Sequence, residues 1–136
     1  MSKGVIISTH GLTSIELLKS AEMIVGNQTN VETVTFKEGE GIDDLKEKYN
    51  KAIQNLQSND ELIILADLWG GSPFNVAANL NIEVVTGVNI PMLIELFMNR
   101  DHMEMDELIK TIMNTSKESI MNHSGLKIDS DIEEEF

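Results

Sequence analysis

The sequence predicts an α/β fold, with a doubly wound, mostly parallel sheet and helices on both of its faces. Three observations lead to this prediction. The hydrophobic period alternates along the chain between about two and about 3.6 residues, as strands and helices follow one another. The runs with the strand period are short and apolar, which is typical of strands buried on both faces. The 136 residues are enough for one domain, and 41% of them are hydrophobic, so a packed core is possible.

Each element is predicted from its own local pattern. Strands are predicted where β-branched and apolar residues alternate or run together, and helices where apolar residues recur every three or four positions. The run from 61 to 66 is the most apolar and is expected to be a central strand. In chain order the predicted elements are strand 4–9, helix 12–25, strand 31–36, helix 42–56, strand 61–66, a helix from 72, strand 82–88, a helix from 91, helix 105–122 and a short strand 126–129.

Local signals also place the ends of several helices. Thr13 and Glu16 have the spacing of a capping box at the start of the first helix, and Gly26 is a natural stop at its end. Ser72 followed by Pro73 predicts another helix start, with serine as the cap and proline in the first helical position.

Composition and charge limit the kinds of partner and the cell compartment that are expected. The formal net charge is −13, which disfavours binding to nucleic acid or to anionic membrane surfaces and favours a protein partner with a basic contact face. The same charge is equally consistent with a role in solubility alone. Because the sequence has no cysteine, no signal-peptide core and no apolar run of membrane-spanning length, we expect a cytoplasmic protein.

Two polar residues stand at the ends of predicted strands. His10 follows the first strand, and Asp67 follows the third. In open parallel sheets, ligands bind beyond the carboxyl ends of the strands, at the point where the strand order reverses. If the second and third strands flank the first, His10 and Asp67 meet at that point.

The chemistry of these residues fits a site that accepts a phosphoryl group. The neutral imidazole of His10 is a nucleophile near neutral pH, and a carboxylate such as Asp67 holds the other ring nitrogen as a donor. Gly70 and Gly71 allow close approach of the backbone, and Ser72 adds a hydroxyl at a helix N-terminus, where free N–H groups attract anions. The predicted site therefore combines a nucleophile, an orienting carboxylate and an anion cradle.

Each part of this site also fits a plainer role. His10 is consistent with a turn residue, Asp67 with a cap, and the segment 70–73 with an ordinary turn-forming loop sequence. Their joint placement at two strand ends favours a functional site. The segment is not a Walker phosphate loop, since no GK[ST] follows, and the end of the first strand lacks the G-x-G-x-x-G of a dinucleotide site.

The remaining candidates are interpreted as surface or core residues. His102 lies in DHMEMDE without a histidine four positions later, so it is interpreted as a solvated helix start and no metal site is predicted. His123, near Gly125, is expected at a helix C-terminus. The predicted core and interface fillers are Met92, Met98, Met103, Met105, Met113 and Met121. Trp69, the only tryptophan, is expected to dock a partner rather than to anchor the loop in the core.

Four segments together resemble the enzyme IIA domain of the mannose-family sugar phosphotransferase system (PTS). They are IISTHG around His10, SAEMIVG ending at Gly26, ADLWGGSPFN over 66–75 and TGVNIPM over 86–92. The long and unusual DLWGGSPFN segment makes the resemblance specific. It assigns residues 1–130 to one PTS IIA domain and leaves 131–136 as an acidic tail, which is expected to fray.

The resemblance implies a phosphoryl carrier without a cofactor. Family members accept the group from the phosphocarrier HPr on a histidine that matches His10 and pass it to a IIB component, which phosphorylates sugar entering through membrane IIC and IID subunits. The family's orienting aspartate matches Asp67, and its serine near the phosphoryl group matches Ser72. Attack is expected from Nε2 of the histidine. The resemblance also implies a homodimer that swaps an antiparallel edge strand, here 126–129, and the acidic tail implies that IIB is a separate protein.

Three other functions remain possible from the sequence. A subunit of a dihydroxyacetone kinase complex would use the same histidine chemistry, but the DLWGGSPFN segment argues against it. A receiver-like module phosphorylated on Asp67 would need further acids to hold Mg²⁺, and the first strand ends in Ser8, Thr9 and His10 instead. A binding module without catalysis would show no phosphoryl transfer at all.

Overall fold

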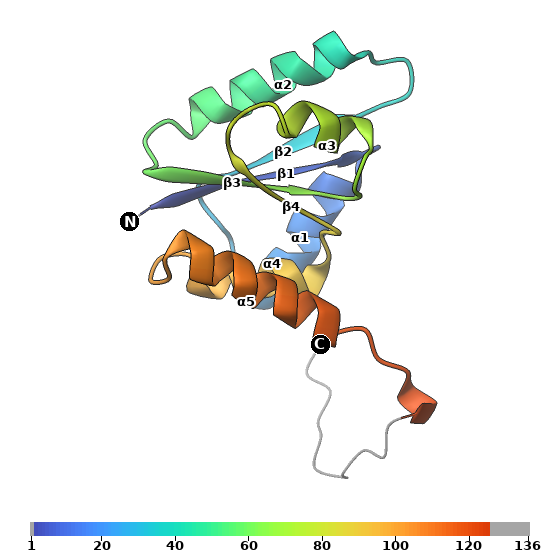
Figure 1. Ribbon diagram of the computed structural model, residues 1–136, viewed down its shortest axis with the longest axis vertical. Helices are drawn as coiled ribbons and strands as arrows, with labels where there is room; N and C mark the ends of the chain where they lie inside the picture. Colours follow the sequence, from blue (N-terminus) through green and yellow to red (C-terminus); the bar gives the residue numbers. More distant parts are fainter. Residues whose placement is uncertain (1, 126–136) are drawn as a thin grey trace.

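Four parallel strands form the sheet of the computed structural model, which describes residues 2–125. The strands are β1 (Lys3–His10), β2 (Val31–Phe36), β3 (Glu61–Ala66) and β4 (Glu83–Thr86). Their order across the sheet is β2-β1-β3-β4 (Figure 1), so the chain first builds to one side of β1 and then to the other. This reversal confirms the predicted doubly wound arrangement and places the switch point between β1 and β3.

Helices cover both faces of the sheet, as predicted. The bounds are α1 (Thr13–Val25), α2 (Ile42–Asn55), α3 (Ser72–Ala77), α4 (Ile90–Asn99) and α5 (Met105–Glu118), followed by a 3₁₀ turn over His123–Gly125. Figure 1 shows α2 and α3 on one face and α1, α4 and α5 on the other. No helix within residues 2–125 is long and apolar enough to cross a membrane.

Side chains on the two faces of β1 pack into two separate hydrophobic cores. Val5 and Ile7 pack with α1, α4 and α5, while Ile6 packs with α2 and α3, and all three side chains are fully buried. Since strand side chains alternate between the faces, Ser8 and His10 point to the same side as Ile6. The His10 side chain therefore lies on the α2–α3 side of the sheet.

The predicted element boundaries agree with the structure at most places. The strands over 31–36 and 61–66 match, β1 is one residue longer at each end than predicted, and β4 is shorter than the predicted 82–88. The last helix ends at Glu118 rather than at 122, because Ile120 is 83% exposed and gives the helix no further contact with the core. The predicted strand 126–129 and the tail 131–136 lie outside the described residues.

The predicted capping box at Thr13 and Glu16 is wrong. Thr13 is the first residue of α1, Leu12 is the N-cap, and no side chain of the cap residue bonds the helix. Instead the buried hydroxyl of Thr9, at the end of β1, accepts the N–H of Ser14 at 2.7 Å. The first turn is thus capped from the preceding strand, an arrangement that sequence spacing does not reveal.

The other helix ends follow the expected chemistry with one shift. Gly26 closes α1 with φ +89°, as predicted for a glycine stop. The cap of α3 is Gly71, so Ser72 is the first helical residue rather than the cap, and Pro73 follows it. Proline is tolerated there because the first N–H groups of a helix have no partner within it.

Two buried cations connect neighbouring elements at the end of the sheet opposite to His10. The ammonium of Lys3 donates to the carbonyl of Arg100 at 2.9 Å, and the Arg100 guanidinium donates back to the carbonyls of Lys3 and Thr29, at 3.3 and 2.6 Å. Lys3 is 2% exposed and Arg100 6%. These contacts hold the start of β1 to the end of α4, far along the strand from His10.

Candidate functional site

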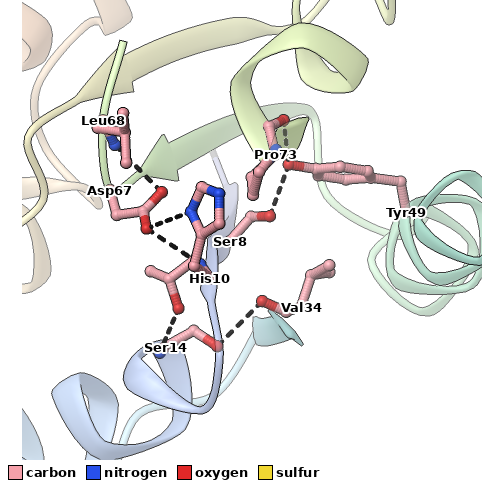
Figure 2. Close-up of polar contacts among 9 residues, drawn as sticks. Ser8, His10, Ser14, Val34, Tyr49, Asp67, Leu68 and Pro73 are labelled. Atoms are coloured by element: carbon pink, nitrogen blue, oxygen red, sulfur yellow. Dashed lines mark hydrogen bonds and ion pairs between the residues drawn. The ribbon is translucent and has the colours of Figure 1, made fainter. Parts of the chain in front are cut away.

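The site forms where the carboxyl ends of β1 and β3 lie side by side. Ser8 pairs with Ala66 in the register of these strands, so His10 and Asp67 follow at the same edge. Nδ1 of His10 lies 2.8 Å from Oδ2 of Asp67, and the same oxygen accepts the backbone N–H of His10 at 3.0 Å (Figure 2). The juxtaposition predicted from strand order is therefore present.

The carboxylate determines which ring nitrogen of the neutral imidazole is free. Asp67 accepts from His10 through Oδ2 and from the N–H of Leu68 through Oδ1, at 3.1 Å. An ionised carboxylate only accepts hydrogen bonds, so the Nδ1 of His10 carries the proton and Nε2 keeps its lone pair. The His10 side chain is 45% exposed, so the imidazole can be approached from solution.

Gly71 lies directly against the imidazole. A Cβ on Gly71 would stand 2.8 Å from Cε1 of His10, closer than side chains pack in proteins, and 3.5 Å from Nε2, which is an ordinary contact distance. The imidazole can occupy this position only because residue 71 has no side chain. Gly70, one residue earlier, adopts φ +84°, a conformation that glycine takes without strain.

Ser72 follows this close contact as the first residue of α3 and is half-buried. The backbone of Gly71 lies beside Cε1 and Nε2 of the ring. The ring of Phe36 also meets the imidazole edge to face, with 6.0 Å between the ring centroids.

Exposed apolar side chains surround the histidine. Trp69 is 75% exposed and stacks on Phe74 with 4.4 Å between the ring centroids, so the alternative that it anchors the loop in the core is wrong. Leu12 and Leu68, on the segments next to His10 and Asp67, are 54% and 49% exposed. Exposed apolar groups that lie on neighbouring segments are typical of a surface that contacts another protein.

Sequence reasoning missed two buried residues beneath the site. The hydroxyl of Tyr49, on α2, lies 2.6 Å from Oγ of Ser8 and 2.8 Å from the carbonyl oxygen of Pro73 (Figure 2). In the sequence, Tyr49 is only one of the apolar positions of the predicted helix 42–56. One signal was available, since Ser8 is a polar residue in an otherwise apolar strand and stands two positions before His10.

Comparison with known proteins assigns this arrangement to a family. Residues 4–113 match the model of the EIIA-man family, described as the PTS system fructose IIA component. The chain belongs to the EIIA-man family of PTS IIA components. The resemblance drawn from the four sequence segments is thereby confirmed.

The relatives of this IIA chain include separate and fused components. It is 41% identical to the mannose-specific EIIAB component of Escherichia coli K12 over 126 residues, which are 88% of this chain but only 39% of that protein. It is 37% identical to the fructose-specific EIIA component of Bacillus subtilis, over 85% of this chain and 82% of that one. The EIIA crystal structure from Streptococcus agalactiae superposes with a TM-score of 0.83 at 30% identity, covering 91% of this chain and 99% of that chain.

The other two histidines of this IIA component lie apart from the site. His102 is exposed, as predicted, but its predicted place at a helix start is wrong, because it lies in the turn between α4 and α5 and α5 begins only at Met105. His123 begins the 3₁₀ turn, so its predicted place at a helix C-terminus is wrong, because α5 ends earlier. Within residues 2–125, no three His, Asp or Glu side chains gather closely enough to hold a metal ion.

The methionines of this IIA component divide between core and surface. Met92 and Met105 are buried, as predicted for core fillers. Three others are exposed in the described chain and fill no core space, namely Met98, Met113 and Met121. Met103 is half-buried against the core beneath α5.

Proposed function

We propose that the protein is a phosphoryl carrier of a sugar phosphotransferase system and that His10 carries the phosphoryl group on Nε2. The observation that supports this most directly is the 2.8 Å contact between Nδ1 of His10 and Asp67. It leaves Nε2 as the nucleophile, exposed to a partner and next to the glycine backbone. A protein built to relay a phosphoryl group between two other proteins needs this accessibility.

In the proposed cycle, the Nε2 lone pair of His10 attacks the phosphorus of the phosphohistidine on HPr. The P–N bond to HPr breaks as the bond to Nε2 forms, and HPr leaves with its histidine restored. The proton on Nδ1 stays hydrogen-bonded to Asp67, whose charge stabilises the positive charge that the ring gains. A histidine of the IIB component then attacks the same phosphorus and returns His10 to its starting form.

The segment from Gly70 to Ser72 is proposed to receive the phosphoryl oxygens. Its backbone lies beside the ring without an intervening side chain, and Ser72 adds a hydroxyl. N–H groups at the start of a helix have no partner within that helix and favour an anion. This role requires no metal ion or cofactor.

Partners and pathway follow from the proposed relay. HPr and a IIB component are proposed to dock on the exposed apolar groups around His10, with Trp69 as the main contact, and IIC and IID membrane subunits are reached only through IIB. The carrier would then work in the cytoplasm. Relatives named for mannose, fructose and sorbose systems favour sugar uptake over service to a dihydroxyacetone kinase.

A homodimer is proposed as the working state. Within the described residues β4 is an edge strand, and unpaired edges invite pairing with another chain. Ile120 and Met121, just after α5, are 83% and 66% exposed and offer apolar area for such a contact. Light scattering in solution would test it, and a monomer at micromolar concentration would contradict it.

Phosphate labelling tests the central proposal. The protein is incubated with HPr that carries radioactive phosphate, alone and as the His10→Ala variant. Label on the wild type that resists alkali, is lost in acid and is absent from His10→Ala supports the proposal. His102→Ala and His123→Ala are matched controls, since both histidines are exposed outside the site. Label that survives in His10→Ala would contradict the assignment, and label that is lost in alkali would point to an acyl phosphate on Asp67 instead.

A further inference from the structure

A buried hydroxyl joins the elements that build the site. Oη of Tyr49 reaches Oγ of Ser8 at 2.6 Å and the carbonyl oxygen of Pro73 at 2.8 Å (Figure 2). Tyr49 and Ser8 are completely buried, and Pro73 is buried as well. These three residues belong to α2, β1 and α3, so a single phenol connects three elements beneath His10.

The number of available protons determines the direction of these contacts. A phenol has one proton, and a carbonyl oxygen only accepts. Both contacts can be hydrogen bonds only if Tyr49 donates to the carbonyl oxygen of Pro73 and the Ser8 hydroxyl donates to Tyr49. Burial raises the pKa of Tyr49 to about 12, although the hydrogen bond with Ser8 opposes this, so the phenol keeps its proton under physiological conditions.

This hydrogen-bonded chain connects the two halves of the site. Ser8 stands two positions before His10 on β1, so both side chains point to the same face of the sheet. Pro73 stands two positions after Gly71, whose Cα faces the imidazole so closely that a Cβ would lie 2.8 Å from Cε1. The gap between the ring and the backbone of Gly71 is therefore set by how β1 and α3 are held relative to each other.

We propose that the Tyr49 hydroxyl is a positioning group that holds the segment 70–72 at the correct distance from His10 for phosphoryl transfer. The hydroxyl touches neither the ring nor the incoming group and acts through Ser8 and Pro73. Asp67 orients the imidazole at the surface, while Tyr49 fixes the opposite wall of the site from the interior. The proposal rests on the proposed function and adds a residue that lies outside the reacting groups.

The test removes only the hydroxyl, as Tyr49→Phe, and measures transfer from phosphorylated HPr. We expect kcat to fall about five- to tenfold, the size of one neutral hydrogen bond, while KM is unchanged because the docking surface is untouched. Ser8→Ala should give a similar loss. The double variant should be no slower than the slower single variant, because both changes break one chain.

A matched control is Ser116→Ala, which removes another buried hydroxyl, bonded at 2.7 Å to the carbonyl of Ile112 within α5. It should transfer at the wild-type rate. A wild-type kcat in Tyr49→Phe overturns the proposal, and so does an equal loss in Ser116→Ala. If Tyr49→Phe does not fold, Ser8→Ala decides by the same criteria.

A second readout separates this proposal from the proposed function. The NMR resonances of the Gly71 amide and the His10 ring should shift in Tyr49→Phe and in Ser8→Ala but not in Ser116→Ala. Unchanged resonances overturn the positioning role. If the wild type takes no phosphate from HPr, the proposed function fails, while these resonances still decide whether Tyr49 positions the segment.

Discussion

One carboxylate oxygen of Asp67 accepts two hydrogen bonds from His10, from the ring Nδ1 at 2.8 Å and from the backbone N–H at 3.0 Å. The ring is thereby fixed relative to the backbone of its own residue through a side chain that directly follows the neighbouring strand β3. The other oxygen accepts the N–H of Leu68 at 3.1 Å, which holds the carboxylate itself in place. Both oxygens of the carboxylate are therefore used as acceptors.

Asp67→Asn should slow phosphorylation of His10 by about 10- to 100-fold, since hydrogen bonds to charged groups contribute about 1.5–3 kcal/mol. An amide has one accepting and one donating end, so it must face either His10 or Leu68 with its NH₂ group. Initial rates of labelling from phosphorylated HPr measure the effect. Asp106→Asn, on the exposed face of α5, is the control and should label like the wild type. A wild-type rate in Asp67→Asn would show that its charge has no role in the transfer.

Gly71→Ala should reduce phosphorylation at least tenfold, because the new Cβ would displace the imidazole from Asp67. Gly41→Ala is the matched control. Both glycines are helix N-caps with extended backbones, but a Cβ on Gly41 would meet only an oxygen of Asp44 at 3.9 Å. Labelling rates and the position of the His10 ring resonances measure the difference. Equal rates in the two variants would mean that the His10 imidazole and the backbone at residue 71 can move apart without slowing phosphorylation.

Trp69→Ala should raise the KM for phosphorylated HPr about tenfold or more, with little change in kcat, if this side chain anchors the partner. The aromatic ring is 75% exposed and stacks on Phe74, so its removal leaves the core and His10 in place. Met23→Ala is the control, because Met23 is 87% exposed near the far end of α1. A lower kcat with an unchanged KM would contradict docking and assign Trp69 to the transfer step.

Tyr49 should ionise only near pH 12 in the folded protein, against about 10.0 when unfolded. The neutral form is the one that the folded state favours, so its contribution to stability is complete below the unfolded pKa and is lost as the pH rises toward the folded one. Because Tyr49 is the only tyrosine, the ultraviolet absorbance of tyrosinate reports it alone. The same titration in denaturant is the control. Ionisation near pH 10 with the fold intact would contradict the buried hydroxyl chain.

Most of the architecture was predictable because its signals are local. The strands over 31–36 and 61–66 came from runs of β-branched and apolar residues, and the prediction that His10 and Asp67 share one edge came from the general geometry of parallel sheets. The capping of α1 was not predictable, because Thr9 reaches Ser14 only through the turn that follows β1. The end of α5 was overestimated because a periodic pattern does not reveal that Ile120 has nothing to pack against.

Local patterns and matching segments were thus enough to establish the α/β class, the family and the two residues at the strand ends. Folding in three dimensions established how those residues are held. Tyr49 meets Ser8 across 41 residues of chain, and Lys3 meets Arg100 across 97. Periodicity and turn chemistry depend on neighbours in sequence, whereas such contacts depend on how whole helices pack on the sheet. For that reason the pair of His10 and Asp67 could be predicted from the sequence, and the contacts beneath the pair could be found only in the structure.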